Sequence, residues 1–258
     1  MGEISIQQQQ KYALEALKIV DKVFKDNGIK YILLAGSCLG AVRQDGFIPW
    51  DDDIDIGVFQ EDYERVKVLL SENLGKEFSW AYVDKQNKFP RFHGKVLRDG
   101  IGCLDVFPLV RTSNNGFMRR FQWIIRKYTF KTYKAKLSYR YKHEDGDFKE
   151  LIKRISARFF SFFVSTKFIM KLKSWNDGLY QGKETNYCIN MYSVYSLKRE
   201  LIRKEWIFPI QSHIFEQCEF PVVNDTDNYL RNLYGNDYMT PKKYGKKARH
   251  DETFLIEN

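Results

Sequence analysis

The sequence predicts an α+β (mixed α/β) fold in which helices flank a mixed sheet and a basic, aromatic-rich helical insertion interrupts the chain. Two observations predict this fold. Segments with helical and strand periodicity alternate over the first 110 residues, and the composition then becomes basic and aromatic before short apolar segments resume. A length of 258 residues suits one large domain, so we expect a single domain over 1–258 with the insertion at about 117–180.

The first predicted elements are a helix, a strand and a second helix. Apolar residues recur at helical spacing over residues 6–27, and Asn27-Gly28 provides a stop signal. Residues 30–35, KYILLA, are a continuous apolar run that predicts a buried strand ending at Gly36-Ser37. A short helix is predicted next in CLGAVRQDG, with Gly46 as its stop.

The following segments predict the rest of the sheet. Residues 54–59, IDIGVF, alternate as a strand does, and a helix fits residues 61–73. Further strands are predicted at 78–83, 94–98 and 102–107. The C-terminal third is predicted to be irregular, because short apolar pieces alternate with Pro, Gly and Asn turns.

The middle of the chain carries all of its net positive charge. Residues 118–174 hold 16 Lys and Arg against four Asp and Glu, whereas the whole chain has a net charge of +9. Two aromatic-rich pieces look helical, and HEDGD at 143–147 separates them. Basic and aromatic faces on one helix suit an anionic membrane surface, but an ordinary packed helical layer with a solvated basic face explains the pattern equally well.

The overall composition limits the class of protein and its compartment. The sequence has no run of about 18 apolar residues, and its N-terminus lacks the pattern of a signal peptide or of myristoylation. The four Cys, at 38, 103, 188 and 218, form no CxxC pair, which favours buried reduced thiols over zinc or disulfides. We therefore expect a cytoplasmic protein.

Carboxylates are concentrated between residues 51 and 55. Asp53 and Asp55 are two residues apart, so in a strand their side chains lie on one face and repel each other unless a cation lies between them. Oxygen ligands suit Mg²⁺ or Mn²⁺. Asp105 lies in another apolar, strand-like segment, CLDVFPL, and would complete the site.

Gly36 and Ser37 come directly after a predicted strand and before a predicted helix. Free N–H groups at such a helix N-terminus bind phosphate well. The order is therefore strand, Gly-Ser turn, helix, strand with Asp-x-Asp, and later strand with Asp. This order resembles the signature of the nucleotidyltransferase superfamily, in which the turn holds nucleotide phosphate and three carboxylates hold metal ions.

The resemblance can be narrowed to one family. Residues 35–57, AGSCLGAVRQDGFIPWDDDIDIG, closely resemble the LicD family, which also contains the fukutin-related proteins. The chain also matches the family's later motifs, at Lys95-Val96, Asp105 to Leu109 (DVFPL), Tyr234-Gly235, Met239, Pro241 and Arg249-His250. The match covers roughly residues 30–110 and 205–250, and Ser37-Cys38 stands where Gly-Thr is expected.

The resemblance implies transfer of a phosphate-bearing group from a CDP-activated donor. The expected reaction moves phosphocholine from CDP-choline to a hydroxyl of a cell-surface glycan, such as a teichoic acid, lipopolysaccharide or capsule precursor, and releases CMP. The first alternative is transfer of glycerol-phosphate or ribitol-phosphate from a CDP-alditol, and a further alternative is a nucleotidyltransferase that uses CTP. Mg²⁺ (or Mn²⁺) would be held by Asp53, Asp55 and Asp105. The glycan acceptor is free or lipid-linked, and we expect a peripheral protein at the cytoplasmic membrane face.

Several other residues are candidates for the same site. Asp51 and Asp52 are expected to support the metal site, to act as a base or to form a solvated turn. The donor's phosphates are expected to contact Gly36, Ser37, Arg43, Lys95, Arg249 and His250. Arg43 has the alternative of an internal salt bridge with one of the Asp residues. Lys95 and its neighbour His93 are expected to face the site together. A quaternary ammonium would need an aromatic cage. The candidates for such a cage are Trp50, Tyr187, Tyr192, Tyr195 and Trp206.

Two other classes compete with a CDP-dependent transferase. A nucleotidyltransferase acting on RNA or a small molecule would need a groove that joins the basic middle segment to the Asp cluster, with rings on which bases stack. A non-catalytic membrane scaffold would be expected to lack one of the three metal carboxylates. All three are present, and we regard a nucleic-acid partner as the weaker interpretation.

Overall fold

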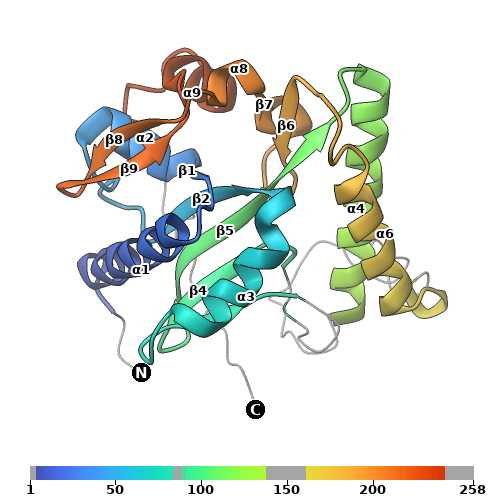
Figure 1. Cartoon of the computed structure of the whole chain (residues 1–258), viewed down its shortest axis with the longest axis horizontal. Coiled ribbons are helices and arrows are strands. Elements are labelled where there is room, and N and C mark those ends of the chain that lie inside the picture. Colours follow the sequence, from blue (N-terminus) through green and yellow to red (C-terminus); the bar gives the residue numbers. More distant parts are fainter. Residues whose placement is uncertain (1–3, 84–88, 90, 138–160, 242–258) are drawn as a thin grey trace, which may run out of the picture.

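The structure is a computed structural model that describes residues 4–83, 89, 91–137 and 161–241 (Figure 1). The helices and strands follow in the order α1 (Ile6–Asp26), β1 (Tyr31–Leu33), α2 (Ala35–Gln44), β2 (Ile54–Phe59), α3 (Tyr63–Asn73), β3 (Ser79–Ala81), β4 (Gly94–Arg98), β5 (Ile101–Thr112), α4 (Gly116–Leu137), α6 (Thr166–Gly178), β6 (Tyr187–Asn190), α7 (Leu197–Glu200), β7 (Leu201–Arg203), α8 (Lys204–Ile207), β8 (Gln211–Phe215), β9 (Cys218–Val222) and α9 (Thr226–Tyr234).

The described strands form one mixed sheet and a separate hairpin. The main sheet has the order β1-β2-β5-β4-β3, and β6 pairs with β5 and with β7. Only β2 and β5 run parallel among these pairs, and the connection between them contains α3, β3 and β4. The expected mixed sheet with flanking helices is therefore confirmed.

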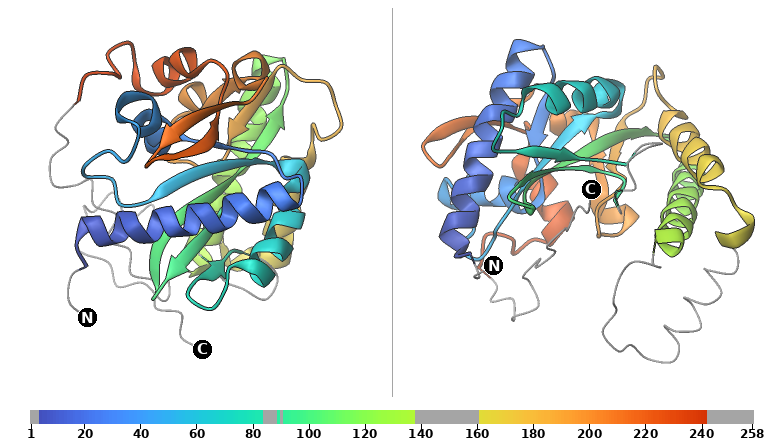
Figure 2. Two further views of the ribbon diagram at one scale, coloured as in Figure 1. Left: turned by 60° about the vertical axis from the view of Figure 1, so that its left-hand side comes forward. Right: turned by 90° about the horizontal axis from the view of Figure 1, so that it is seen from below.

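The helices cover the sheet from several sides. α1 and α3 lie together against the strands, while α2, α9 and the β8–β9 hairpin gather at one end and α4 and α6 stand side by side at the other (Figures 1 and 2). α1 buries the apolar residues that repeat at helical spacing, namely Ala13, Ala16, Leu17, Val20 and Phe24. Its N-cap is Ser5, whose side chain accepts the N–H of Gln8.

The element bounds agree closely with the sequence prediction near the centre of the sheet. β4 is the predicted strand 94–98, whereas β5 extends to Thr112 because its second half pairs with β6. The stretch from residue 205 onward is not irregular as predicted: it forms the β8–β9 hairpin and α9, and β6 and β7 before it join the main sheet. Single short strands carry too little periodicity to be recognised before their partners are known.

The basic insertion is helical wherever it is described. α4 covers the first predicted helical piece as far as Leu137, and α6 begins only at Thr166, after the N-cap Ser165. The predicted break at 143–147 lies outside the described residues. None of the described helices is both long and apolar enough to cross a membrane.

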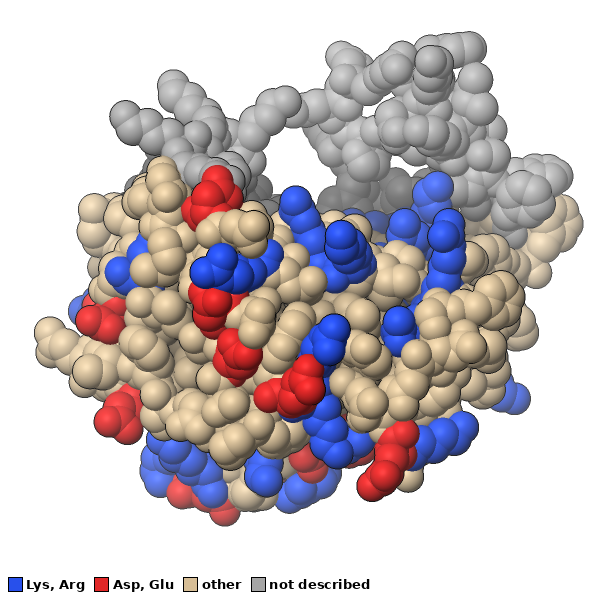
Figure 3. All heavy atoms as spheres, turned by 90° about the horizontal axis from the view of Figure 1, so that it is seen from above, with Lys and Arg blue, Asp and Glu red and all other residues tan. Residues whose placement is uncertain are grey.

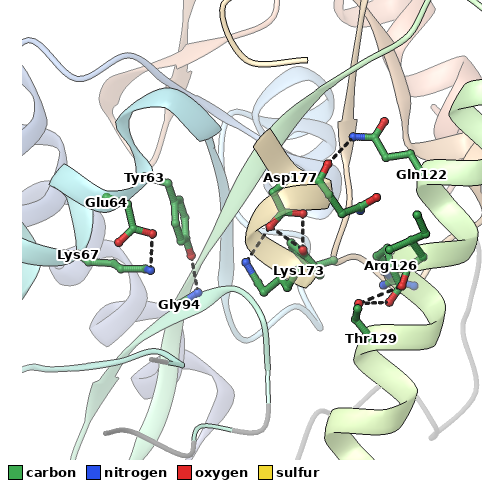
Figure 4. Close-up of polar contacts among 12 residues, drawn as sticks. Tyr63, Glu64, Lys67, Gly94, Gln122, Arg126, Thr129, Lys173 and Asp177 are labelled. Atoms are coloured by element: carbon green, nitrogen blue, oxygen red, sulfur yellow. Dashed lines mark hydrogen bonds and ion pairs between the residues drawn. The ribbon is translucent and has the colours of Figure 1, made fainter. Parts of the chain in front are cut away.

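Buried polar contacts attach α4 and α6 to the sheet (Figure 4). Thr112 at the end of β5 donates to Gln122 Oε1 at 2.7 Å, and Gln122 Nε2 donates to the carbonyl of Asn176 at 2.9 Å. Lys173 Nζ lies 2.8 Å from Asp177 Oδ2. The Tyr192 hydroxyl, just after β6, donates to the same carboxylate at 2.6 Å. These bonds satisfy groups that would be costly to bury alone.

Tyr63 of α3 joins the two strands that carry the predicted site. Its hydroxyl accepts the N–H of Gly94 at 2.7 Å (Figure 4). The same hydroxyl donates to the carbonyl of Val106 at 2.8 Å. Gly94 and Val106 are register partners at the start of β4. The hydroxyl therefore bridges the two strands at this end of the β4–β5 ladder.

Replacing Tyr63 by Phe is expected to lower the free energy of unfolding by about 1–3 kcal/mol, because it leaves a buried N–H and a buried carbonyl without this partner. Urea denaturation of the purified protein measures the loss. The matched control is Tyr128→Phe on the exposed side of α4, for which a change within about 0.5 kcal/mol is expected. Equal stability of the two variants would contradict the bridging role.

Candidate active site

A row of three charged side chains crosses the middle of the sheet. Asp55 of β2 is the register partner of Asp105 in β5, and Asp105 is also the register partner of Lys95 in β4. Side chains of register partners lie on the same face of a sheet. The pairing of these three strands therefore brings Asp55, Asp105 and Lys95 together although they are far apart in the chain.

Asp53 joins this row from the loop that leads into β2. Ligand oxygens of Asp53, Asp55 and Asp105 all lie within 4.8 Å of one another. Lys95 Nζ lies 3.2 Å from Asp105 Oδ1 and 3.5 Å from Asp53 Oδ2. The three predicted carboxylates thus form a cluster, and Lys95 is paired with two of them.

A second group of carboxylates adjoins the first. Oxygens of Asp51, Asp52 and Asp53 also lie within 4.8 Å of one another. Asp53 therefore belongs to both groups. Gln10 of α1 fixes the start of this acidic loop, because its Nε2 donates to the carbonyl of Asp51 at 2.9 Å.

Burial and mutual repulsion control the protonation of the cluster. Burial, together with the charges of Asp53 and Asp52, raises the pKa of Asp51 to about 8. Burial and the charges of Asp53 and Asp105 also raise the pKa of Asp55 well above its usual range. Burial acts in the same direction on Asp105, but Lys95 and His93 outweigh it and lower that pKa. The site therefore holds more carboxylates than its own cations neutralise.

The carboxylates fit a divalent cation. The donor set is three carboxylates, which is the oxygen-rich kind of site that Mg²⁺ and Mn²⁺ prefer. Asp105 Oδ1 is buried and makes no hydrogen bond with the described residues, although Lys95 lies near it. A buried carboxylate oxygen in this state has coordination capacity to spare.

The first turn of α2 lies beside the acidic loop. Helix geometry leaves the N–H groups of Ala35, Gly36 and Ser37 without acceptors inside the helix, and the Tyr229 hydroxyl of α9 accepts that of Ala35 at 3.0 Å. A Cβ on Gly36 would lie 2.4 Å from Asp51 Oδ2, so only glycine allows Asp51 to approach this turn. The Ser37 hydroxyl accepts the N–H of Asp55 at 2.8 Å and so fixes α2 to β2.

The acidic cluster forms part of a cavity of about 310 Å³. Gly36, Arg43, Trp50 and the carboxylates of Asp51, Asp53, Asp55 and Asp105 line it. The lining also contains five aromatic side chains, namely Phe107, Tyr192, Tyr195, Tyr234 and Tyr238. A dense negative charge therefore shares one cavity with five neutral rings.

Some predicted residues lie in this cavity and others do not. Arg43 and Trp50 line it, as do Tyr192 and Tyr195 from the proposed aromatic cage. Tyr187 instead stacks under Arg119 of α4, and Trp206 lies under Arg203. Those two rings are not in the cavity lining. Arg249 and His250 lie outside the described residues, and their roles stay predictions.

Several lining residues were not singled out as site residues from the sequence. They are Arg91, Asn190, Ser193, Tyr238 and Thr240, together with Tyr234, which had been noted only as part of a motif. His93, which was expected near the site, lines the cavity with Nε2 3.6 Å from Asp105 Oδ2. Burial lowers its pKa, although the charge of Asp105 acts against the shift. The sequence indicated a contribution from this part of the chain through the family motif at Tyr234-Gly235 and through the cage candidates Tyr192 and Tyr195.

The insertion holds the aromatic wall in place from behind. Arg126 of α4 donates through Nη2 to the carbonyl of Ser193 at 2.9 Å, and its guanidinium stacks near Trp123 and Tyr192. Glu200 of α7 is also buried here and hydrogen-bonds with the Ser193 side chain. Burial raises the pKa of Glu200 to about 7, although Ser193 and Arg126 act against the shift.

Glu200 is expected to make stability depend on pH. A carboxyl with a raised folded-state pKa stabilises the fold while it is protonated, so this contribution is lost as the pH rises from about 4.5 through 7. The wild-type free energy of unfolding is expected to fall over this pH range, and Glu200→Gln should reduce that fall by up to about 3 kcal/mol. Unfolding in urea at pH 5 and at pH 8 measures it. Glu219→Gln, on the exposed side of β9, should keep the wild-type slope, and an unchanged slope in Glu200→Gln would refute the assignment.

Comparison with known proteins agrees with this geometry. Residues 28–142 match the family described as LicD/FKTN/FKRP, nucleotidyltransferase domain. The lipopolysaccharide cholinephosphotransferase LicD of Haemophilus influenzae is 22% identical over 287 aligned positions, which cover 99% of this chain and 100% of that protein.

Two mammalian relatives match over shorter stretches. The ribitol-5-phosphate transferase FKTN of Mus musculus is 40% identical over 65 residues, or 25% of this chain and 14% of FKTN. The ribitol 5-phosphate transferase FKRP of Homo sapiens is 38% identical over 115 residues, or 43% of this chain and 22% of FKRP. The chain thus spans less than a quarter of these two proteins. Residues 28–142 thus carry a LicD-family domain, and the chain is homologous to the LicD cholinephosphotransferase and to the FKTN and FKRP ribitol-phosphate transferases.

Proposed function

We propose that the protein transfers phosphocholine from CDP-choline to a hydroxyl of a cell-surface glycan and releases CMP. The acceptor would be a teichoic acid, lipopolysaccharide or capsule precursor, free or lipid-linked. The observation that carries the proposal is the pairing of an acidic cluster with an aromatic wall in one cavity of about 310 Å³. The homology to a cholinephosphotransferase over nearly the whole chain supports the same head group.

Asp53, Asp55 and Asp105 would hold Mg²⁺ (or Mn²⁺) in this reaction. The bound metal would neutralise the charge of the donor's diphosphate and align the in-line displacement. Lys95 lies against two of these carboxylates, so its ammonium is positioned to meet a phosphate oxygen at the same place. Arg43 and Arg91 line the cavity and supply guanidinium groups for phosphate. The first turn of α2 offers the N–H groups of Gly36 and Ser37.

Asp51 is the better candidate for the base that receives the acceptor's proton. Asp51 lines the cavity, whereas Asp52 is buried outside its lining. A pKa of about 8 lies close to the pH at which proton transfer would operate. Asp52 then supports the loop from behind.

The aromatic wall favours a quaternary ammonium over an alditol. A trimethylammonium group gains from ring faces and from nearby negative charge, whereas an alditol needs hydrogen-bonding partners for each hydroxyl. Trp50, Tyr192 and Tyr195 are the cage candidates from the sequence that line this cavity. The Tyr192 hydroxyl is already bonded to Asp177, so this ring presents its face more readily than its oxygen.

Transfer of glycerol-phosphate or ribitol-phosphate from a CDP-alditol is the second candidate. The cavity also contains Asn190, Ser193 and Thr240, and Asn190 Oδ1 is buried without a hydrogen-bond partner among the described residues. Such an atom suits a ligand hydroxyl. The homology to FKTN and FKRP favours this alternative. A nucleotidyltransferase using CTP is a third candidate, because the matched domain bears that name.

The proposed setting is the cytoplasmic face of a membrane, where a lipid-linked glycan precursor would be accessible to a peripheral enzyme. The positive charge of the insertion is what supports an anionic surface as a partner. We do not expect a nucleic-acid partner, because the cavity itself is strongly acidic on one side.

Replacing Asp53 or Asp105 by Asn should abolish Mg²⁺-dependent CMP release, with a loss of at least about 100-fold. Calorimetric titration should show weaker Mg²⁺ binding as well, because each change removes one anionic ligand. Asp26→Asn, at an exposed ion pair on α1, is the matched control. Unchanged Mg²⁺ binding in both site variants would rule out the carboxylate cluster as the metal site.

Trp50→Leu should weaken binding of CDP-choline by about 5- to 30-fold and leave binding of CMP within about twofold. Titration of CDP-choline, CDP-glycerol, CDP-ribitol and CTP in the presence of Mg²⁺ measures this selectivity. Trp175→Leu, which changes an exposed tryptophan of α6, is the control. Preference for a CDP-alditol would move the proposal to the second candidate, and preference for CTP with pyrophosphate release would reject CDP-dependent transfer.

A further inference from the structure

The side of α4 that faces away from the sheet carries an exposed apolar stripe. Phe117, Phe121, Ile124 and Tyr128 follow one another at spacings of four, three and four residues, which places them on one face of a helix. Phe117 is 76% exposed, Ile124 55% and Tyr128 47%. The opposite face is the buried one, with Gln122, Arg126 and Thr129 among its residues. The packed face of α4 is therefore largely polar, whereas its apolar side chains lie mainly on the face that is left exposed.

Basic residues border this stripe on one side. Arg120, Lys127, Lys131 and Lys134 are exposed, and helical spacing places all four on the same flank of the stripe. α4 contains no Asp or Glu. An ordinary solvated helix face carries both signs of charge, often as pairs one turn apart. The outer face of α4 is thus apolar along its centre and uniformly positive along one edge.

α6 repeats the same arrangement beside α4. Phe168 and Trp175 are about half exposed and lie two turns apart, with Lys171 between them and Lys167 nearby. Phe162, which precedes α6, is 82% exposed. The acidic residue of α6 is Asp177, which is buried and paired with Lys173. On the upper right of the view in Figure 3, the side on which α4 and α6 lie, Lys and Arg gather with no Asp or Glu among them.

We propose that the outer faces of α4 and α6 form a docking surface for an anionic lipid bilayer. Aromatic and aliphatic side chains along the centre would enter the headgroup region, and the basic flank would meet the negative lipid charge. Contiguous exposed apolar surface of this kind marks an interaction site in a water-soluble domain. Uniform positive charge selects an anionic partner and disfavours a second copy of the same face, which would bring like charges together.

The bilayer fits this surface better than a nucleic acid does. Nucleic-acid surfaces of this type combine a positive groove with rings on which bases stack. Here the centre of the stripe includes Ile124, with Met118 exposed beside it, and neither side chain offers a stacking plane. The surface therefore suits a partner with an apolar interior, and this conclusion does not depend on which group the active site transfers.

Docking at this surface would place the active site close to the membrane. The inner face of α4 contacts the cavity wall directly, because Arg126 donates to the Ser193 carbonyl. Asp177 of α6 likewise accepts the Tyr192 hydroxyl at 2.6 Å. A helix is only about 10 Å across, so the bilayer surface and the aromatic wall would be separated by a single helical layer.

The experiment is co-sedimentation of the full chain with vesicles of phosphatidylcholine alone and of phosphatidylcholine with phosphatidylglycerol. We expect binding only to the anionic vesicles, with an affinity that falls as salt is raised. Lys127→Gln/Lys131→Gln should weaken binding roughly 30-fold, at about fivefold for each lysine. Phe121→Ser/Ile124→Ser should weaken it at least about tenfold. Circular dichroism checks that each variant is folded.

Matched controls test whether the surface is specific. Lys11→Gln/Lys18→Gln on α1 changes the net charge equally, and Val68→Ser on α3 removes an exposed apolar residue elsewhere; both should bind as wild type. Equal loss in the α1 variant would overturn the proposal in favour of diffuse charge. Failure to bind anionic vesicles would also overturn the proposal. So would a result in which the α4 substitutions weaken binding to an RNA oligonucleotide but leave vesicle binding unchanged. Donor binding is measured separately, so failure of the proposed function would leave these results unaffected.

Discussion

Repulsion among the carboxylates of Asp53, Asp55 and Asp105 is the constraint on which the rest of the site depends. The parallel register of β2 and β5 places Asp55 directly beside Asp105, and this pairing is part of the core of the sheet. The fold cannot separate the two charges without losing the strand pairing. It compensates with Lys95 on the third strand of the same row and by raising the pKa of Asp55 and Asp51. A cation at this position would relieve the repulsion that burial creates.

Small residues around the row allow this concentration of charge. A Cβ on Gly102 would lie 2.7 Å from the end of the Lys95 side chain, so glycine there leaves space for the lysine to reach Asp105. Gly36 does the same for Asp51 at the first turn of α2. Ala35, at the start of that helix, has a positive φ of 42°, a conformation that costs energy in a residue other than glycine. The sharp turn between β1 and α2 is thus built for close approach.

The three clustered carboxylates could be predicted because their signal is local. Asp53 and Asp55 are two residues apart in the sequence, which is the spacing of side chains on one face of a strand. Asp105 is an isolated carboxylate in an apolar segment, so a charged or metal partner is expected for it. The contact of Lys95 with them depends on register, which strand periodicity alone does not provide. Asn190, Ser193 and Tyr238 were not predicted as site residues, because they lie in β6, in the loop after β6 and after α9, far from the acidic motif in the sequence. Aromatic residues in such segments look like ordinary core residues until the tertiary structure brings them together.

The structure allows the two faces of the insertion to be interpreted separately. The composition of the insertion alone could not distinguish a packed helical layer from a membrane-facing one, and the structure shows that α4 has both kinds of face. Arg126 illustrates why: it is one of the basic residues of the segment, yet it is buried and supports the Ser193 carbonyl of the cavity wall. Lys173 is likewise paired inside the protein with Asp177. The exposed Arg120, Lys127, Lys131 and Lys134 of α4 instead flank its apolar stripe. One segment therefore shapes the cavity from within and presents a uniformly basic, aromatic surface outward, so that whatever binds the outer face lies one helix away from the reacting groups.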